Sequence, residues 1–109
     1  MNKKEFFKYL DSNRTERLRI RLEIEKGKIV NLLFQYESLI KGKWREIVRY
    51  DFAHGFFHRD VLYPDGTQEK TRIDINDLNL GSLYAEQDLK DKWEFYKERY
   101  TKRMKKNGK

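Results

Sequence analysis

Residues 17–36 read RLRIRLEIEKGKIVNLLFQY, and this stretch decides the fold because apolar and polar residues alternate along it. The apolar residues at its even positions are Leu18, Ile20, Leu22, Ile24, Val30, Leu32, Phe34 and Tyr36. A period of two is typical of a strand with one buried face, so the stretch predicts two strands. The loop Glu25-Lys26-Gly27 is expected to join them into a hairpin, with Gly27 in the left-handed position.

The length of that loop sets the register of the hairpin. A three-residue loop pairs Leu22 with Val30, Ile20 with Leu32 and Leu18 with Phe34. A slip of one residue would turn the arginines toward the core, so the apolar pattern favours this pairing.

Further strands are predicted downstream, each bounded by turn residues. They are Trp44 to Phe52, Phe56 to Tyr63 and, as a fifth strand or an edge, Thr67 to Ile73. The turn Pro64-Asp65-Gly66 is a strong signal, because Pro presets φ and Gly supplies a left-handed residue. Upstream, residues 3–10 favour a short helix with Phe6, Phe7 and Leu10 on one side.

The C-terminal third has the pattern of one long helix. Large apolar residues recur there at steps of four and three: Leu89, Trp93, Tyr96, Tyr100 and Met104. Ser82 is the expected N-cap, after an irregular segment from Asp74 to Gly81. The prediction is an α+β fold, in which an antiparallel β-meander of four or five strands carries the long helix on one face, with a short N-terminal helix. Residues 1–109 are expected to form a single domain.

Both histidines of the chain lie in one predicted hairpin, residues 50–60, which read YDFAHGFFHRD. If His54-Gly55 forms a two-residue turn, Asp51 lies opposite His58 and Arg49 lies opposite Asp60. Because side chains alternate along a strand, these four polar side chains share one face of the sheet.

This polar group admits three interpretations. In a metal-independent ribonuclease, His58 exchanges protons, Asp51 orients it, Arg49 holds a phosphoryl group and His54 is a second proton donor. In a salt-bridge ladder, the same cross-strand pairs only stabilise the sheet. A metal site from Asp51, His54, His58 and Asp60 has suitable ligand types, but the spacing matches no established motif. No metal or other cofactor is therefore expected.

Basic residues are predicted to line the sheet face opposite the long helix. Apart from His58, they are Arg17, Arg19, Arg21, Arg45, Arg49, Lys70 and Arg72. Arginine binds phosphate through two parallel hydrogen bonds, so this face is a candidate anion-binding surface. The alternative is an ordinary solvated face, since every half-buried strand needs polar residues on its outer side.

Four apolar residues are predicted on the same face: Ile29, Leu33, Ile47 and Leu62. An apolar patch on an otherwise polar face is typical of a surface that a partner covers. This observation favours a homodimeric structural or interaction protein as a third class of function.

The composition favours an anionic partner. The net charge of +7 and the pI of about 9.6 favour nucleic acid first and an anionic membrane second. No apolar run approaches the ~18 residues of a membrane span, and no signal-peptide pattern opens the chain. The chain has no cysteine, which excludes disulfides and thiolate metal sites and favours a cytoplasmic setting. Charged residues reach 39%, a balance typical of proteins from hot environments.

These observations rank the possible functions. No Gly-rich phosphate loop follows a strand, and no serine stands in a nucleophile elbow. The leading hypothesis is therefore a non-enzymatic module that binds an anionic partner, most simply RNA, through the arginine-bearing face. The ribonuclease is the first alternative and the homodimer the second.

A family resemblance rests on the run Val48-Arg49-Tyr50-Asp51, followed by Ala53-His54-Gly55, His58-Arg59 and Tyr63-Pro64-Asp65-Gly66. It resembles a small family of uncharacterised prokaryotic proteins and is more distantly similar to TumE-type toxin components, which carry an Arg-x-Asp strand followed by clustered histidines. This chain lacks the extra histidines of that pattern and has Asp60 where one is expected. The resemblance implies a toxin or another protein that acts on nucleic acid and, in the case of a toxin, an antitoxin-like protein partner. Its matching residues are Arg49, Asp51, His54 and His58.

Overall fold

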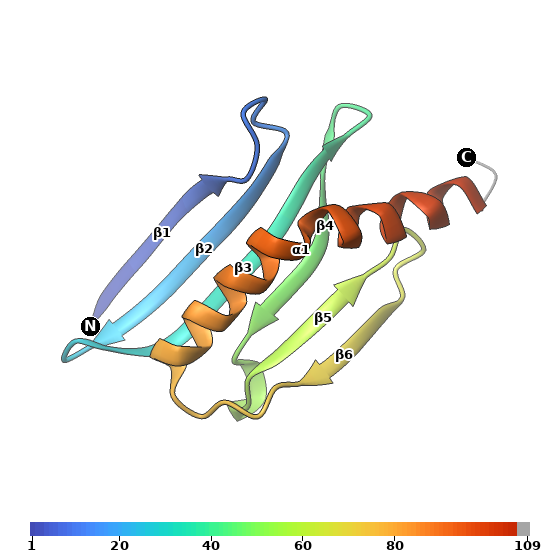
Figure 1. Cartoon of the computed structure of the whole chain (residues 1–109). Coiled ribbons are helices and arrows are strands. Elements are labelled where there is room, and N and C mark those ends of the chain that lie inside the picture. Colours follow the sequence, from blue (N-terminus) through green and yellow to red (C-terminus); the bar gives the residue numbers. More distant parts are fainter. Residues whose placement is uncertain (107–109) are drawn as a thin grey trace.

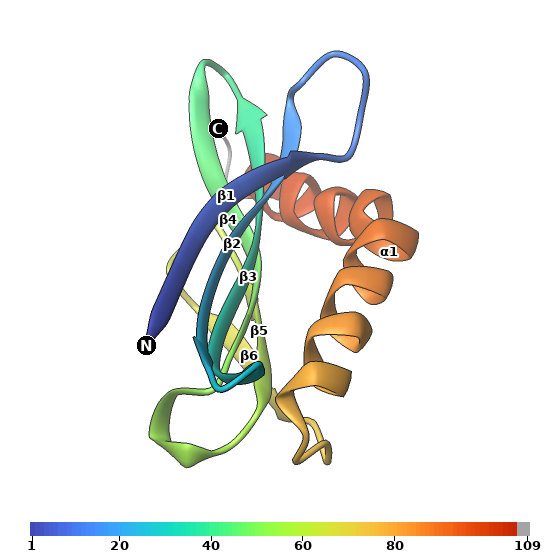
Figure 2. The same ribbon diagram turned by 90° about the vertical axis from the view of Figure 1, so that its left-hand side faces the viewer.

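A computed structural model describes residues 1–106, apart from the side chains of His54 and Lys106. Within these residues the chain forms a six-stranded antiparallel sheet in sequence order and one long helix (Figure 1). The elements are β1 Asn2–Tyr9, β2 Glu16–Glu25, β3 Lys28–Ile40, β4 Lys43–Asp51, the 3-10 turn η1 Ala53–Gly55, β5 His58–Leu62, β6 Gln68–Arg72 and α1 Leu78–Lys106. The α+β class, the antiparallel meander and the long C-terminal helix are confirmed. The helix lies along one face of the twisted sheet (Figure 2).

The predicted N-terminal helix is wrong, because residues 2–9 form the edge strand β1. This strand pairs with β2 along its whole length, from Asn2 opposite Ile24 to Tyr9 opposite Arg17. The turn that follows is held by the Asp11 carboxylate, which accepts hydrogen bonds from the backbone N–H groups of Thr15 and Glu16 at 3.1 and 3.0 Å. The sheet therefore has six strands rather than four or five.

The β2–β3 hairpin has a tighter turn than predicted. Glu25 pairs with Lys28, so the loop is the dipeptide Lys26-Gly27, with φ of 51° and 77°. Two residues of positive φ are typical of a type I′ turn, which matches the twist of the strands better than the three-residue loop expected from the sequence. This turn moves the register by one residue, and an unpaired Val30 moves it by another, so beyond Asn31 the strands pair two residues away from the predicted register: Leu22 with Leu32, Ile20 with Phe34 and Leu18 with Tyr36. A shift of two keeps the side chains of this part of the hairpin on their predicted faces.

Two irregularities in the pairing of the strands move side chains to the face opposite the predicted one. One lies at the start of β3, where Ile24 pairs with Ile29 but Glu23 pairs with Asn31. The other lies in β4, where Tyr36 pairs with Val48 but Glu37 pairs with Glu46. Because a β-bulge inserts one unpaired residue, the alternation reverses beyond it.

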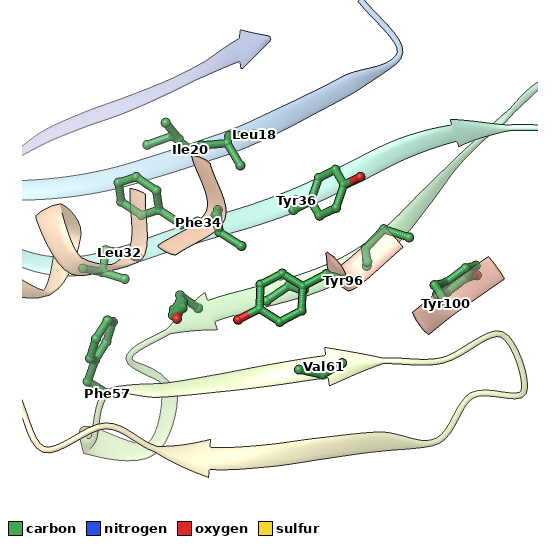
Figure 3. Close-up of a cluster of buried hydrophobic side chains, with 14 of the residues drawn as sticks. Leu18, Ile20, Leu32, Phe34, Tyr36, Phe57, Val61, Tyr96 and Tyr100 are labelled. Atoms are coloured by element: carbon green, nitrogen blue, oxygen red, sulfur yellow. The ribbon is translucent and has the colours of Figure 1, made fainter. Parts of the chain in front are cut away.

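The core lies between the sheet and α1 (Figure 3). The predicted helical stripe is confirmed, since Leu89, Tyr96 and Tyr100 are buried, and Trp93 and Met104 pack partly buried against them. The helix begins at Leu78, so the prediction of Ser82 as N-cap is wrong. Asp77 has that role, because its carboxylate accepts a hydrogen bond from the Asn79 N–H at 2.9 Å.

Buried tyrosines tie the helix to the sheet through carboxylates. The hydroxyls of Tyr50 and Tyr96 both donate to Asp88 of α1, at 2.6 and 2.7 Å. The Tyr36 hydroxyl donates to Glu16 at 2.6 Å, and Lys97 of α1 binds the other oxygen of that carboxylate at 2.7 Å. In the part of the chain that the structure describes, no helix is long and apolar enough to span a membrane.

Candidate functional site

The histidine hairpin has the predicted register. Asp51 lies opposite His58 and Arg49 opposite Asp60, although the connection is longer than a two-residue turn. The chain leaves β4 at Asp51, passes through η1 and enters β5 only at His58. The Asp51 carboxylate accepts a hydrogen bond from the Ala53 N–H at 3.0 Å, which starts the turn.

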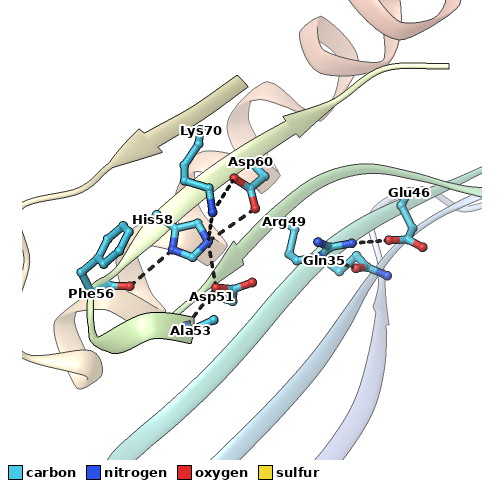
Figure 4. Close-up of polar contacts among 9 residues, drawn as sticks. All are labelled: Gln35, Glu46, Arg49, Asp51, Ala53, Phe56, His58, Asp60 and Lys70. Atoms are coloured by element: carbon cyan, nitrogen blue, oxygen red, sulfur yellow. Dashed lines mark hydrogen bonds and ion pairs between the residues drawn. The ribbon is translucent and has the colours of Figure 1, made fainter. Parts of the chain in front are cut away.

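The His58 ring is buried among charged groups on the sheet face opposite α1 (Figure 4). Its Nε2 lies 2.9 Å from Asp51 Oδ1 and 3.4 Å from Asp60 Oδ2. Its Nδ1 lies 3.4 Å from the Phe56 carbonyl oxygen. The Lys70 ammonium group, from the neighbouring strand β6, lies 3.5 Å from Nε2 and 3.8 Å from Asp60 Oδ1.

Arg49 takes no part in this cluster. Its guanidinium donates to Glu46 at 2.6 Å and to Gln35 at 3.1 Å, in the direction away from His58 (Figure 4). The structure thus brings together Asp51, His58 and Asp60 from the predicted group and adds Lys70. Lys70 lies opposite Asp60 on the neighbouring strand, and this pairing would have predicted its place in the cluster. The sequence alone did not give the register of β6 against β5. The side chain of His54 lies outside the described residues, so its predicted role stays a prediction.

The outer face of the sheet, meaning the face opposite α1, carries most of the predicted basic residues. Arg17, Arg19 and Arg21 stand on β2, Arg49 on β4, and Lys70 and Arg72 on β6. Arg45 is not among them. The irregularity near Ile47 pairs it with Ser38, on the helix side, so its predicted place on this face is wrong.

Carboxylates on the same face bind most of these cations. Arg17 contacts Glu37 at 2.8 Å, Arg49 contacts Glu46 at 2.6 Å, and Arg19 and Arg21 share Glu5 at 3.2 and 3.7 Å. The outer face therefore carries many ion pairs and is not uniformly positive.

Aromatic rings interleave with the arginines at one end of this face. The Arg17 guanidinium lies between the rings of Phe7 and Trp44, 4.3 and 3.7 Å from their centroids. Arg14 stacks over Tyr9 at 5.4 Å. The three rings are 42, 36 and 43% exposed for Phe7, Trp44 and Tyr9 respectively. We call Phe7, Tyr9, Arg14, Arg17 and Trp44 the aromatic–arginine surface.

Sequence reasoning missed this surface for two reasons. It assigned Phe7 and its neighbours to a helix. It also placed Arg45 on the outer face, which by alternation leaves Trp44 on the inner one, because the strand irregularity at Ile47 was not foreseen. The five residues come from β1, β2, β4 and the turn at Arg14, so no local spacing connects them. Only the pairing of β1 with β2 brings Phe7 beside the arginines.

The apolar patch that was predicted as a dimer interface loses two of its residues to the same strand irregularities. Ile47 is fully buried in the core and Ile29 packs against it, both on the helix side. Leu33 and Leu62 stay on the outer face, partly buried, but apart: Leu33 lies on β3 opposite Asp51, and Leu62 is the last residue of β5. The prediction that all four share an outer patch is wrong, and the oligomeric state itself stays a prediction.

Comparison with known proteins identifies a family whose description states no activity. No curated protein and no solved structure matches the chain. The expected resemblance to a family of uncharacterised proteins is confirmed to that extent, while the more distant similarity to TumE-type toxins stays a prediction. The match covers residues 1–106, nearly the whole length, and the chain therefore belongs to the family described as Domain of unknown function (DUF7718).

Proposed function

We propose that the chain binds single-stranded RNA through the aromatic–arginine surface on the outer face of the sheet. The observation that carries the proposal is the position of Arg17 between the exposed rings of Phe7 and Trp44. Proteins that bind single strands combine aromatic side chains, on which bases stack, with cations that follow the backbone. Each stacked base contributes roughly 1–3 kcal/mol in such proteins.

The surroundings of Arg17 favour a preorganised surface. Its Nε donates to Glu37 at 2.8 Å, and Glu37 accepts a second hydrogen bond from Gln35 at 2.7 Å. Gln35 in turn accepts from Arg49 at 3.1 Å. This chain of contacts fixes the guanidinium plane between the two rings, while its terminal nitrogens make no hydrogen bond within residues 1–106. Those nitrogens suit a phosphate oxygen.

The internal ion pairs limit how much of the binding comes from charge alone. Because carboxylates already contact Arg19, Arg21 and Arg49, few phosphates gain an unpaired cation on this face. We expect weak binding in the micromolar range. The logarithm of the association constant should fall with the logarithm of salt at a slope of about −0.7 per phosphate contacted.

Fluorescence anisotropy with a labelled, mixed-sequence single-stranded RNA at two salt concentrations tests the proposal. The double variant Arg19→Glu/Arg21→Glu should weaken binding at low salt, since it reverses two exposed cations on the outer face, of which Arg19 lies 5.6 Å from the Phe7 ring. The matched control is Lys90→Glu/Lys92→Glu, which makes the same change of charge on α1. Equal loss in both variants would mean that net charge alone drives binding, and no binding by the parent would end the proposal.

A ribonuclease is the second candidate, favoured by the 2.9 Å contact between Asp51 and His58. Two features oppose it: the His58 ring is 1% exposed, and Arg49 is bound elsewhere. The same RNA incubated with the protein and resolved on a denaturing gel decides the matter. Cleavage that is lost in His58→Ala, with the fold intact by circular dichroism, would establish the enzyme. Intact RNA would leave the cluster without a role in RNA cleavage.

A further inference from the structure

The buried cluster on β4, β5 and β6 has the composition of a metal site. One oxygen each from Asp51 and Asp60 and one nitrogen from His58 lie within 4.8 Å of one another. We propose that these three residues bind a single divalent transition-metal ion, and that the ammonium group of Lys70 occupies the site when the ion is absent. The proposal is independent of RNA binding by the aromatic–arginine surface.

The distances fit a shared ion. Nitrogen and oxygen ligands of Zn²⁺ lie about 2.0–2.2 Å from the metal, so two ligand atoms in a tetrahedral site are roughly 3.3–3.5 Å apart. His58 Nε2 is 2.9 Å from Asp51 Oδ1 and 3.4 Å from Asp60 Oδ2, so these two pairs need shifts of only a few tenths of an ångström. The two carboxylates offer oxygens within 4.8 Å of each other, which an ion between them would draw closer. Three protein ligands of the imidazole and carboxylate types are the usual number in open zinc sites, where water fills the fourth position.

An unpartnered oxygen points to the same place. Asp60 is 3% exposed, and its Oδ1 makes no hydrogen bond within the described residues. The nearest cation, Lys70 Nζ, stays 3.8 Å away, which is beyond hydrogen-bonding distance. A buried carboxylate oxygen without a partner is costly, so each one in a folded protein calls for an explanation such as an absent ion. The other oxygen of the same carboxylate, Oδ2, lies 3.4 Å from the His58 nitrogen that would be the metal ligand.

Backbone groups orient two of the three ligands. The Phe56 carbonyl lies 3.4 Å from His58 Nδ1, where it can accept a hydrogen bond, and so leaves Nε2, the nitrogen that faces Asp51 and Asp60, as the ligand atom. The Ala53 N–H donates to Asp51 Oδ1 at 3.0 Å. Outer contacts of this kind fix the ligands of protein metal sites and tune their affinity.

The side chain of Lys70 is able to leave the site when a metal ion binds. It stands on the edge strand β6, and its side chain is 42% exposed, in contrast to the buried ligands. Its ammonium group lies 3.5 Å from His58 Nε2 and 3.8 Å from Asp60 Oδ1, where it contributes positive charge beside the Asp60 carboxylate. A long, flexible stem allows it to turn into solvent when an ion of higher charge enters.

Isothermal titration of the whole chain with Zn²⁺, after removal of bound metal with a chelator, tests the site. We expect one ion per chain. The isosteric variant Asp60→Asn should weaken binding by at least the 10–100-fold that is typical of changes around a metal site. Lys70→Met should tighten binding several-fold because it removes the competing cation, whereas Lys3→Met, on the opposite edge strand, should leave the affinity unchanged.

The outcomes separate this site from surface binding. Only two histidines are present, so His54→Ala tells whether the other imidazole is the true ligand. Absence of binding, or binding that persists in Asp60→Asn and is lost in His54→Ala, would overturn the proposal. Unchanged or weaker affinity in Lys70→Met would overturn the role of Lys70, and this result does not depend on a change in the buried core.

Discussion

At the scale of single residues, the most unusual environment belongs to three buried tyrosines. Burial raises the pKa of Tyr36, Tyr50 and Tyr96 well above the ordinary value, and hydrogen bonds to carboxylates raise it further. Tyr50 and Tyr96 share Asp88, while Tyr36 binds Glu16. A phenolate at any of these positions would face a buried carboxylate, so the folded chain keeps all three protonated.

This arrangement predicts a loss of stability at alkaline pH. The unfolded chain releases these protons near pH 10, the ordinary value for tyrosine, whereas the folded chain holds them to higher pH. The stabilisation is therefore complete below about pH 10 and is lost as the pH rises further. The slope is about 1.4 kcal/mol per pH unit for each such tyrosine. Urea unfolding between about pH 9 and pH 11 measures it.

Two variants identify the residues responsible. Tyr50→Phe should remove its share of the slope, because Phe has no proton to lose. Tyr9→Phe is the matched control, since that ring is 43% exposed on the edge strand. An equal slope in the parent and in Tyr50→Phe would mean that other groups cause the alkaline sensitivity.

At the scale of secondary-structure elements, α1 is held to the sheet by Asp88 as well as by apolar packing. Its carboxylate, 9% exposed, accepts hydrogen bonds from Tyr50 of β4 and Tyr96 of α1. Hydrogen bonds to charged groups contribute about 1.5–3 kcal/mol. Asp88→Asn should therefore lower the free energy of unfolding by about that amount. Asp91→Asn, on the same helix and bonded only to Gln87, should change it little.

Thermal or urea unfolding followed by circular dichroism compares the two variants. Equal stabilities for Asp88→Asn and the parent would show that apolar contacts alone hold the helix. Retention of the full helix signal in Asp88→Asn is expected, because Leu89, Tyr96 and Tyr100 still pack on the sheet.

The sequence predicts those features of the strands and the helix that depend on residues close together in the chain. The pairing of Asp51 with His58 followed from alternation and a turn dipeptide, and it is confirmed although the turn itself is longer. Alternation did not locate the irregularities at Val30 and Ile47, because each falls in a pair of adjacent apolar residues, Ile29-Val30 and Ile47-Val48, and either member of such a pair suits the core. They moved Arg45 to the helix side and brought Trp44 to the outer face, where it contacts Arg17.

The strand β1 shows why other features depend on contacts between residues far apart in the sequence. Phe6 and Phe7 are adjacent, which fits a helix face as well as a strand with both faces partly covered. Pairing with β2 settles it, since Phe6 lies opposite Ile20 and Phe7 opposite Arg19. The aromatic–arginine surface was beyond sequence reasoning for that reason, whereas the acid and histidine cluster was within it.

At the scale of the whole molecule, positive charge and the candidate binding surface lie in different places. Residues 97–106 of α1 hold six Lys or Arg and one Glu, a balance of +5 out of the chain's +7. The outer face of the sheet instead pairs its cations with carboxylates. The basic composition raised anionic partners as a hypothesis, but it did not indicate which surface would bind them.

The two tryptophans provide the most direct test of the central claim that single-stranded RNA binds the outer face. Trp44 lies 36% exposed on that face, and Trp93 lies on the helix side, packed edge-on against Tyr36. Both indole N–H groups are observed in one nitrogen–proton NMR spectrum of the labelled protein. During titration with mixed-sequence single-stranded RNA, the Trp44 signal should shift in proportion to the bound fraction while the Trp93 signal stays in place. A shift of Trp93 with Trp44 unchanged, or no shift of either at saturating RNA, would contradict the account.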